Sequence, residues 1–241
     1  MLYIIGLGLN EQSISLEGLE AVKKCNKIYL ENYTVEFPYE TSELEKVLGK
    51  KVVELDRGEV ESLRLIGEAK VEDVCLLVYG SPLFATTHIS LIEDCRKDEV
   101  EVKMIYSSSV FDAIAETGLQ LYKFGKIASM PKWNGDENFK PTSFLDFVEE
   151  NQKIDAHSLI LIDIGLDFEN ALNQLIEANR DNDKKIKFDK ILVCSKLGTG
   201  ERKIFYGSVD ELKGKKVLNP FCFIIPGKLH FLENEIINLI I

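Results

Sequence analysis

Predicted strands and helices alternate along the first 106 residues, and this alternation constrains the fold more than any other feature of the chain. Short apolar runs predict strands, and apolar residues recurring every three or four positions predict helices. The predicted strands are residues 2–6, 28–30, 51–55, 74–79 and 100–106, and the helices between them begin near residues 16, 41, 62 and 87. Such a series predicts a mostly parallel sheet with helices on both faces.

The second half has shorter predicted strands and a less regular order. Its strands are expected at residues 124–130, 158–164, 191–194, 203–207 and 222–225, and its helices at 109–122, 143–151, from 168, and 229–240. In the first of these helices, Ser109 is the expected N-cap and Asp112 the acidic third residue. The sequence therefore predicts a two-domain α/β fold: a parallel domain over residues 1–106 and a mixed-sheet domain over 107–241.

Composition places the chain among ordinary globular proteins. Of 241 residues, 45% are hydrophobic and 29% are charged, and no apolar run reaches the roughly 18 residues of a membrane span. The first residues, MLYII, lack the basic region of a signal peptide, so we expect a cytoplasmic protein. The net charge of −11 argues against general nucleic-acid binding.

The charge is unevenly distributed. Residues 184–216 contain ten Lys or Arg and four Asp or Glu, so this segment is basic while the rest of the chain is strongly acidic. One interpretation is a solvated basic surface. The other is a docking patch for an acidic macromolecule.

Cysteine and histidine patterns give no sign of a disulfide framework or a metal site. The five cysteines are scattered, their number is odd, and no CxxC occurs, which is typical of a reducing compartment; three of them lie in or beside apolar runs and are expected to be core thiols. The three histidines, His88, His157 and His230, share no helical spacing. We therefore expect no metal centre.

Candidate ligand-binding residues follow the predicted strands. Residues 80–88, GSPLFATTH, come directly after a buried strand, and ligands of α/β sheets bind just past the carboxyl ends of strands. Ser81 and Phe84 are candidates in this loop. Ser109 and Val110 are candidates after the next strand, where a helix N-terminus favours a carboxylate. Similar loops after strands of the second half, 196–200 and 226–230, predict a ligand cleft between two domains.

Known short motifs do not match these loops. Residues 6–11, GLGLNE, lack the third glycine of the dinucleotide fingerprint and carry Glu11 in its place. The loop at 196–200, KLGTG, lacks the lysine pattern of a P-loop, and no G-x-S-x-G elbow occurs. The two glycines of the first loop still allow a ligand to approach the backbone closely, and the alternative is a plain tight turn.

Several longer blocks resemble the diphthine synthase family, in the family's order and over nearly the whole chain. They are LYIIGLGL at 2–9, GLE at 18–20, YLENYT at 29–34, ATTH at 85–88, TGLQLYKFG at 117–125, PTS at 141–143 and PGKLH at 226–230. The resemblance implies a two-domain tetrapyrrole-methylase fold, S-adenosylmethionine as cofactor in a cleft between the domains, and a homodimer. It also implies methylation of a modified histidine amino group on translation elongation factor 2, giving diphthine and S-adenosylhomocysteine.

The resemblance assigns cofactor contacts residue by residue. In the first half these positions are Leu9, Ser81, Phe84, Ser109 and Val110; in the second half they are Ile162, Leu197 and His230. The family usually has Asp where this chain has Ser81, and a hydroxyl binds the cofactor's polar groups more weakly than a carboxylate. The residue near Leu197 is also larger than the family's alanine.

Three residues are candidates for stabilising the cationic acceptor through aromatic faces or a carboxylate: Tyr29, Glu31 and Tyr33. Ordinary packing at the strand end is the alternative explanation for them. For the whole chain, two alternative functions stand beside diphthine synthesis. One is another methyltransferase of this fold, acting on a porphyrinoid or ribosomal RNA; the other is a cofactor-binding protein without catalysis.

Overall fold

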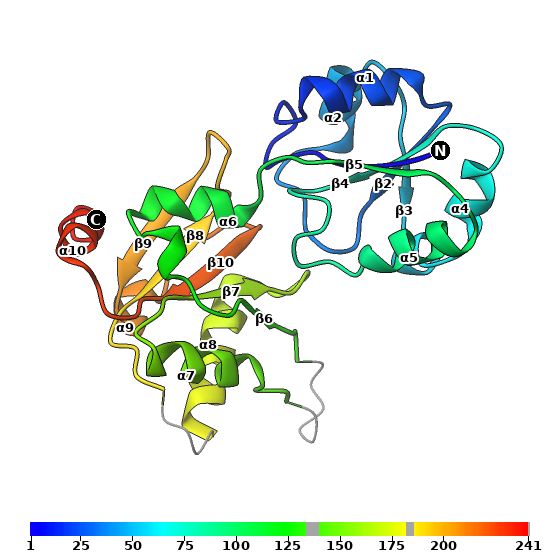
Figure 1. Ribbon diagram of the computed structural model, residues 1–241. Coiled ribbons are helices and arrows are strands. Elements are labelled where there is room, and N and C mark those ends of the chain that lie inside the picture. Colours follow the sequence, from blue (N-terminus) through cyan, green and yellow to red (C-terminus); the bar gives the residue numbers. More distant parts are fainter. Residues whose placement is uncertain (134–139, 182–185, 241) are drawn as a thin grey trace. The chain divides into compact units, whose positions relative to one another are not determined.

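The computed structural model describes residues 1–133, 140–181 and 186–240. The chain divides into two compact units, Met1–Val110 and Phe111–Ile241, each with its own sheet (Figure 1). This division lies four residues beyond the predicted domain boundary. It places Ser109 and Val110 with the strands of the first unit.

The first unit is built on a parallel five-stranded sheet in the order β3-β2-β4-β1-β5. The central strands β1 and β4 run in register, with Leu2 beside Val74 and Ile5 beside Leu77. Their near-continuous apolar sequences fit strands buried on both faces. The strands are β1 (Leu2–Gly6), β2 (Lys27–Glu31), β3 (Val53–Leu55), β4 (Val74–Val78) and β5 (Val102–Ile105).

Helices cover both faces of this sheet, as the alternating pattern predicts. Ile5 and Leu77 pack with residues of α1 (Leu16–Lys24) and α2 (Thr41–Leu48). The neighbouring side chains of the same strands pack on the opposite face, with α4 (Arg64–Ala69) and α5 (Ile89–Lys97). Figure 1 shows α1 and α2 on one side of the sheet and α4 and α5 on the other.

Local sequence explains where these helices begin, with one exception. Ser15 caps α1 by accepting the Gly18 N–H at 3.0 Å, as predicted. The prediction that Thr86 or Thr87 caps α5 is wrong, because His88 is the N-cap residue and gives no side-chain cap. Instead the Thr86 hydroxyl accepts the His88 N–H at 3.0 Å, which holds the loop before the helix. A short helix α3 (Arg57–Val60), capped by Asp56, was not predicted.

The second unit contains a mixed five-stranded sheet in the order β6-β7-β10-β8-β9. Only β6 and β7 are parallel; β10 runs antiparallel to both of its neighbours, and β9 is antiparallel to β8. A mixed sheet was expected here. The strands are β6 (Ala128–Met130), β7 (Ser158–Ile162), β8 (Ile191–Ser195), β9 (Lys203–Gly207) and β10 (Phe221–Ile225).

Buried side chains lie on both faces of this second sheet. Ile160, Val193 and Phe223 share a core with α7 (Phe144–Lys153), α8 (Phe168–Asp181) and α9 (Val209–Leu212). Their strand neighbours, which point to the opposite face, are also fully buried: Leu159, Leu192 and Ile224. The last helix, α10 (Phe231–Ile237), begins after the N-cap residue His230.

The predicted helix over residues 109–122 is wrong. The structure has α6 (Val110–Ala113), then a 3-10 turn η1 (Ile114–Thr117), a left-handed residue at Gly118 and a second turn η2 (Leu121–Lys123). Gly118 has φ = 84°, and a Cβ there would lie 2.3 Å from Ile236 of α10. Close packing of the C-terminal helix therefore requires a glycine, which ends the helical pattern.

Other elements are shorter than their patterns. Of the predicted strand 124–130, only Ala128–Met130 joins the sheet, while Phe124 forms an isolated bridge with His157. The predicted helix 229–240 is limited to Phe231–Ile237. In the described part of the chain, none of the helices has the length and apolar content needed to span a membrane.

Candidate functional site at the strand ends

The loops after β1 and β4 are joined by a pair of backbone hydrogen bonds between two glycines. Gly8 N–H donates to the Gly80 carbonyl at 3.1 Å, and Gly80 N–H donates to the Gly8 carbonyl at 2.9 Å. Both residues are left-handed, with φ of 73° and 71°. Glycine adopts this conformation without steric cost. The predicted site loops 6–9 and 80–84 therefore lie side by side at the carboxyl edge of the sheet.

Packing within the protein itself requires a glycine at positions 6 and 8. A Cβ on Gly8 would lie 2.4 Å from the Ser13 Cβ, and one on Gly6 would lie 2.6 Å from the Gly80 oxygen. At Gly8 the space that a Cβ would take is thus filled by Ser13. A Cβ on Gly80 would meet no atom closer than 3.8 Å, so room is left there.

Further hydrogen bonds fix the positions around Leu9. The Tyr79 hydroxyl donates to the Leu9 carbonyl at 3.2 Å, and the Leu9 side chain is buried. The Ser107 hydroxyl, after β5, donates to the Ser13 carbonyl at 3.0 Å. The loops after β1, β4 and β5 thus form one hydrogen-bonded edge.

The candidate residues of the first unit all lie on this edge. Ser81 and Phe84 are half-buried in the loop after β4, where Phe84 N–H donates to the Ser81 carbonyl at 3.1 Å. Ser109 is buried and Val110 is half-buried at the beginning of α6. The Cα of Ser109 is 3.8 Å from the position of a Cβ on Gly80, so the β4 and β5 loops meet there. The structure therefore brings Leu9, Ser81, Phe84 and Ser109 to one edge.

The three residues considered for stabilising a cationic acceptor make other contacts in the structure. Glu31 is fully buried and accepts hydrogen bonds from the Tyr33 and Thr34 N–H groups and the Thr34 hydroxyl, at 2.8–2.9 Å. Tyr29 is buried, and its hydroxyl donates to Glu68 at 2.7 Å. Tyr33 contacts His88 instead. Strand-end packing is therefore the explanation that the structure supports for Glu31 and Tyr29.

In the second unit, two of the three candidates share an edge and the third does not. Ile162 ends β7, and Leu197 follows β8, so both lie where β10 begins. There Phe221 pairs with Ser195, and the Lys196 N–H donates to the Pro220 carbonyl at 2.8 Å. His230 follows the other end of β10, where Ile225 pairs with Ser158.

The first residues of β10 therefore lie beside Ile162 and Leu197. The sequence did not predict this proximity. The missing information is the direction of β10, because only an antiparallel β10 brings its start beside the ends of β7 and β8. A single sequence gives the strand but not its partner or its direction. The one local signal is Asn219-Pro220, which marks a turn just before the strand.

His230 lies on a separate hollow of about 640 Å³. It is exposed, it caps α10, and its ring is 4.3 Å from that of Phe231. The hollow is lined by residues from the TGLQLYKFG and PGKLH blocks and the segment between α7 and β7: Gln120, Tyr122, Lys123, Phe124, Ile154, Asp155, Ala156, Lys228, Leu229 and His230.

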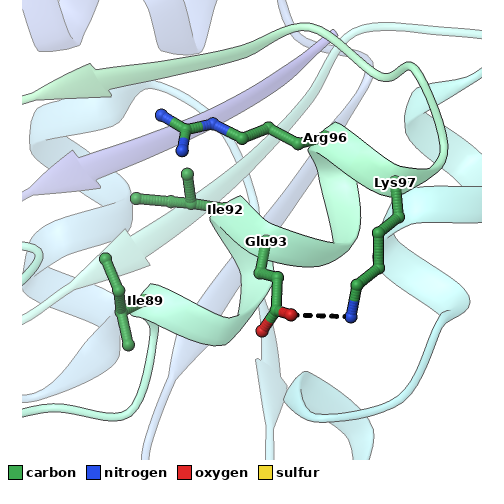
Figure 2. A pocket seen from close by; sticks show the side chains of 5 residues that line it. All are labelled: Ile89, Ile92, Glu93, Arg96 and Lys97. Atoms are coloured by element: carbon green, nitrogen blue, oxygen red, sulfur yellow. Dashed lines mark ion pairs between the residues drawn. The ribbon is translucent and has the colours of Figure 1, made fainter.

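A second hollow lies on the outer side of α5 and contains no predicted site residue. Figure 2 shows Ile89, Ile92 and Arg96 along this helix, with Glu93 paired to Lys97 at 2.8 Å. Lys97 also pairs with Asp94 at 3.8 Å, and both ion pairs lie within one helix on a largely exposed lysine, so they contribute little energy. This surface has no converging polar groups that would orient a ligand.

The cysteine, histidine and carboxylate side chains of the described residues form neither a disulfide nor a metal site. All five cysteines are free and buried, as core thiols are. Burial raises the pKa of the Cys95 thiol, so this side chain stays protonated and unreactive. Over residues 1–133, 140–181 and 186–240, no cluster of His, Cys, Asp and Glu has the arrangement of a metal site.

Comparison with known proteins gives the family. The model of the Tetrapyrrole (Corrin/Porphyrin) Methylases matches residues 1–213. The diphthine synthase of Methanocaldococcus jannaschii is 39% identical over 98% of this chain and 96% of its own length. This chain belongs to the diphthine synthase family. The diphthine methyl ester synthase of Schizosaccharomyces pombe is 36% identical, over 99% of this chain and 93% of its own.

A solved structure agrees with this assignment. A crystal structure of diphthine synthase superposes with a TM-score of 0.88 and 31% identity, over 99% of this chain and 95% of that chain. The predicted α/β architecture, with one parallel sheet and one mixed sheet, is therefore confirmed as that of the diphthine synthase family. The enzyme class is accordingly that of a methyltransferase.

Proposed function

We propose that this protein methylates the amino group of the modified histidine of translation elongation factor 2 and so forms diphthine. The observation that carries the proposal is the 39% identity to a diphthine synthase over nearly the full length of both chains. Such coverage leaves little room for a different acceptor, such as a porphyrinoid or ribosomal RNA. A cofactor-binding protein without catalysis is the alternative that the assay below addresses.

The proposed cofactor is S-adenosylmethionine, and the residues at the strand ends fit it in kind. Phe84 and Val110 are half-buried and offer apolar surface for the adenine and the carbons around the sulfonium, while Ser81 and Ser109 offer hydroxyls. Leu9, whose side chain is buried, is proposed from the family resemblance and its place at the end of the first strand. Gly80 leaves room beside the loop backbone. Open α/β sheets bind ligands at this edge. No carboxylate stands at position 81, so we expect binding of the cofactor's polar groups to rely on hydroxyl and main-chain groups.

In the second unit, we propose Ile162 and Leu197 as further cofactor contacts, because both follow strands that end at one edge of that sheet. His230 is proposed from the family resemblance alone, and its place at the other end of β10 makes it the position most worth testing. If His230→Ala binds cofactor as the wild type does, His230 is removed from this set.

The bound cofactor would supply an activated methyl group on a sulfonium, so the protein's part is positioning and exclusion of water. The strand-end loops are suited to positioning because hydrogen bonds tie each to a neighbour, as between Gly8 and Gly80. The acceptor amine must be neutral to attack. Glu31 has its carboxylate fully engaged by its own loop, so we assign it no role as the base.

The proposed partners are elongation factor 2 as protein substrate and a second copy of this chain in a homodimer. The basic segment is proposed to dock the substrate. Lys184 and Lys185 of that segment lie outside the described residues. Lys190, Lys203 and Lys216 are exposed on or near the edge strand β9. Their charge is opposite to that of the chain as a whole. We also propose a cytoplasmic location.

The deciding experiment is a methyl-transfer assay with labelled S-adenosylmethionine. Its acceptor is an archaeal elongation factor 2 that carries the aminocarboxypropyl-histidine precursor, and mass spectrometry counts the methyl groups. Methyl groups added to that histidine amine support the proposal, and three of them give diphthine. An additional base-labile methyl group would indicate a methyl ester, as in the name of the S. pombe relative. Cofactor binding without transfer would contradict the proposal.

A further inference from the structure

A chain of two hydrogen bonds joins the loop after β2 to the loop after β4. The Tyr33 hydroxyl lies 3.3 Å from Nε2 of His88, and Nδ1 of His88 lies 3.3 Å from the Pro82 carbonyl oxygen. A carbonyl only accepts, so Nδ1 carries the proton and Nε2 accepts from Tyr33. His88 is 1% exposed. The ATTH block thus ends on a buried imidazole with both nitrogens engaged.

Pro82 is held from two sides. Its carbonyl contacts His88, and its ring packs so closely on Gly6 of β1 that a Cβ on Gly6 would lie 2.9 Å from Cδ. Ser81 precedes Pro82 directly, and Phe84 N–H bonds back to the Ser81 carbonyl. A shift of Pro82 therefore moves Ser81 and Phe84, both proposed to contact the cofactor.

The backbone three residues before His88, at Ala85, adopts a conformation that needs support. Ala85 has φ = 55°, the left-handed region that side-chain-bearing residues rarely adopt. Such residues persist where their surroundings over-determine them. Here the Thr86 hydroxyl binds the His88 N–H at 3.0 Å, and His88 in turn binds Pro82. The contacts of the ATTH block thus close the loop on itself.

We propose that His88 is a positioning residue for the cofactor loop: its Nδ1–H anchors Pro82, and the Tyr33 hydroxyl fixes the ring orientation and tautomer that this requires. The inference rests on the proposed function, because it concerns the cofactor of that reaction. It assigns no contact between His88 and the cofactor. Glu31 and Glu61 are the acidic groups near the ring, Arg57 packs on Tyr33, and burial keeps the pKa of His88 below its ordinary value.

The test compares two replacements of His88 that each keep one nitrogen. His88→Asn retains a donor near the Nδ1 position, and His88→Gln retains a group near Nε2 only. We expect His88→Gln to raise the dissociation constant of S-adenosylhomocysteine about tenfold, the loss of roughly one hydrogen bond. We expect His88→Asn to restore most of that affinity, and Tyr33→Phe to fall between them.

A control separates positioning from general stability. Leu44→Ala removes a buried side chain of α2 on the face away from α5 and lowers the melting temperature without touching the loop. Calorimetric titration and thermal unfolding are measured for all four variants, together with KM for the cofactor and kcat. We expect KM to rise more than kcat falls in His88→Gln.

The possible results separate a failure of the positioning role of His88 from a failure of the proposed function. If the wild type fails to bind S-adenosylhomocysteine, the proposed function fails. If the wild type binds but His88→Gln has the same dissociation constant, the positioning role is overturned. It is also overturned if His88→Asn and His88→Gln raise the dissociation constant equally, or if Leu44→Ala weakens binding in proportion to its loss of stability.

Discussion

His157 and Glu233 form a fully buried pair, with Nε2 of the imidazole 3.1 Å from Oε1 of the carboxylate. The Gly227 N–H donates to Nδ1 of the same ring at 2.9 Å, so Nε2 carries the proton and donates to Glu233. Glu233 also pairs with Lys123 and accepts the Gln120 N–H at 2.9 Å. One carboxylate thus ties α10 to the segment after Gly118 and to the start of β7.

The His157–Glu233 pair predicts that the folded protein loses stability in acid. Burial lowers the pKa of His157 below 6.5, although Glu233 partly offsets this effect. Burial alone would raise the pKa of Glu233, but hydrogen bonds from Lys123, Gln120, His230 and His157 lower it to about 2. Both folded-state pKa values lie below their unfolded values. Stability is therefore complete above pH 6.5, falls as His157 is forced to protonate, and falls further between pH 4.5 and 2.

The measurement is the free energy of unfolding by urea between pH 3 and 8, in steps, with the His157 ring followed by NMR. His88 is also buried with a lowered pKa and contributes in the same direction, so the ring signals assign the two contributions. A His157 resonance that titrates at or above pH 6.5 in the folded protein would contradict the prediction.

Glu233→Gln should destabilise the second unit at neutral pH by about 2 kcal/mol, because it leaves Lys123 without its counter-charge and weakens several hydrogen bonds. The matched control is Glu235→Gln, an exposed position in the same helix. We expect that change to lie within about 0.5 kcal/mol of the wild type. Equal effects of the two substitutions in urea unfolding would sink the idea that Glu233 ties these segments together.

Gly8→Ala and Gly80→Ala should differ although both residues have positive φ. At Gly80 the methyl group has room, so we expect only the left-handed backbone cost of about 1 kcal/mol. At Gly8 the methyl group also collides with Ser13, and we expect a loss of more than about 2 kcal/mol. Thermal or urea unfolding compares them, and an equal or reversed order would show that Ser13 moves aside.

Ser81→Asp should tighten cofactor binding about tenfold, since a carboxylate makes stronger hydrogen bonds to hydroxyl or ammonium groups than a serine does. Asn26→Asp, on an exposed position directly before β2 and so at the opposite, amino edge of the sheet, adds the same charge away from the site and should leave the affinity unchanged. Both dissociation constants are measured by calorimetry. A weaker affinity in Ser81→Asp than in the wild type would argue against Ser81 as a polar contact.

Replacing Lys190, Lys203 and Lys216 together with Glu should reduce kcat/KM for the protein substrate and leave cofactor affinity intact. The reduction should shrink as salt is added, because exposed charges are screened over about 10 Å at 0.1 M salt. A control triple replacement uses lysines of the first unit, Lys24, Lys46 and Lys70. Equal activity of the two triple variants on elongation factor 2 would remove the docking proposal.

The sequence by itself determined the fold class and most elements, because local periodicity and capping agree with the tertiary structure there. Residues 41–48 and 203–207 are a helix and a strand as predicted, and Ser15 caps its helix. It also placed Leu9, Ser81, Phe84 and Ser109 after strands. Because parallel strands end at one edge, the βα alternation predicts that these residues share an edge, whereas the strand order that makes β4, β1 and β5 neighbours comes from the tertiary structure.

Only the tertiary structure decided features that depend on non-local partners. Gly118 breaks a helical pattern because Ile236, more than a hundred residues later, needs the space. His230 is separated from Ile162 and Leu197 because β10 runs antiparallel to its neighbours. Tyr33 meets His88 because β2 and β4, which precede their two loops, are neighbours in the sheet. A sequence encodes each strand locally, but packing chooses its direction and neighbours.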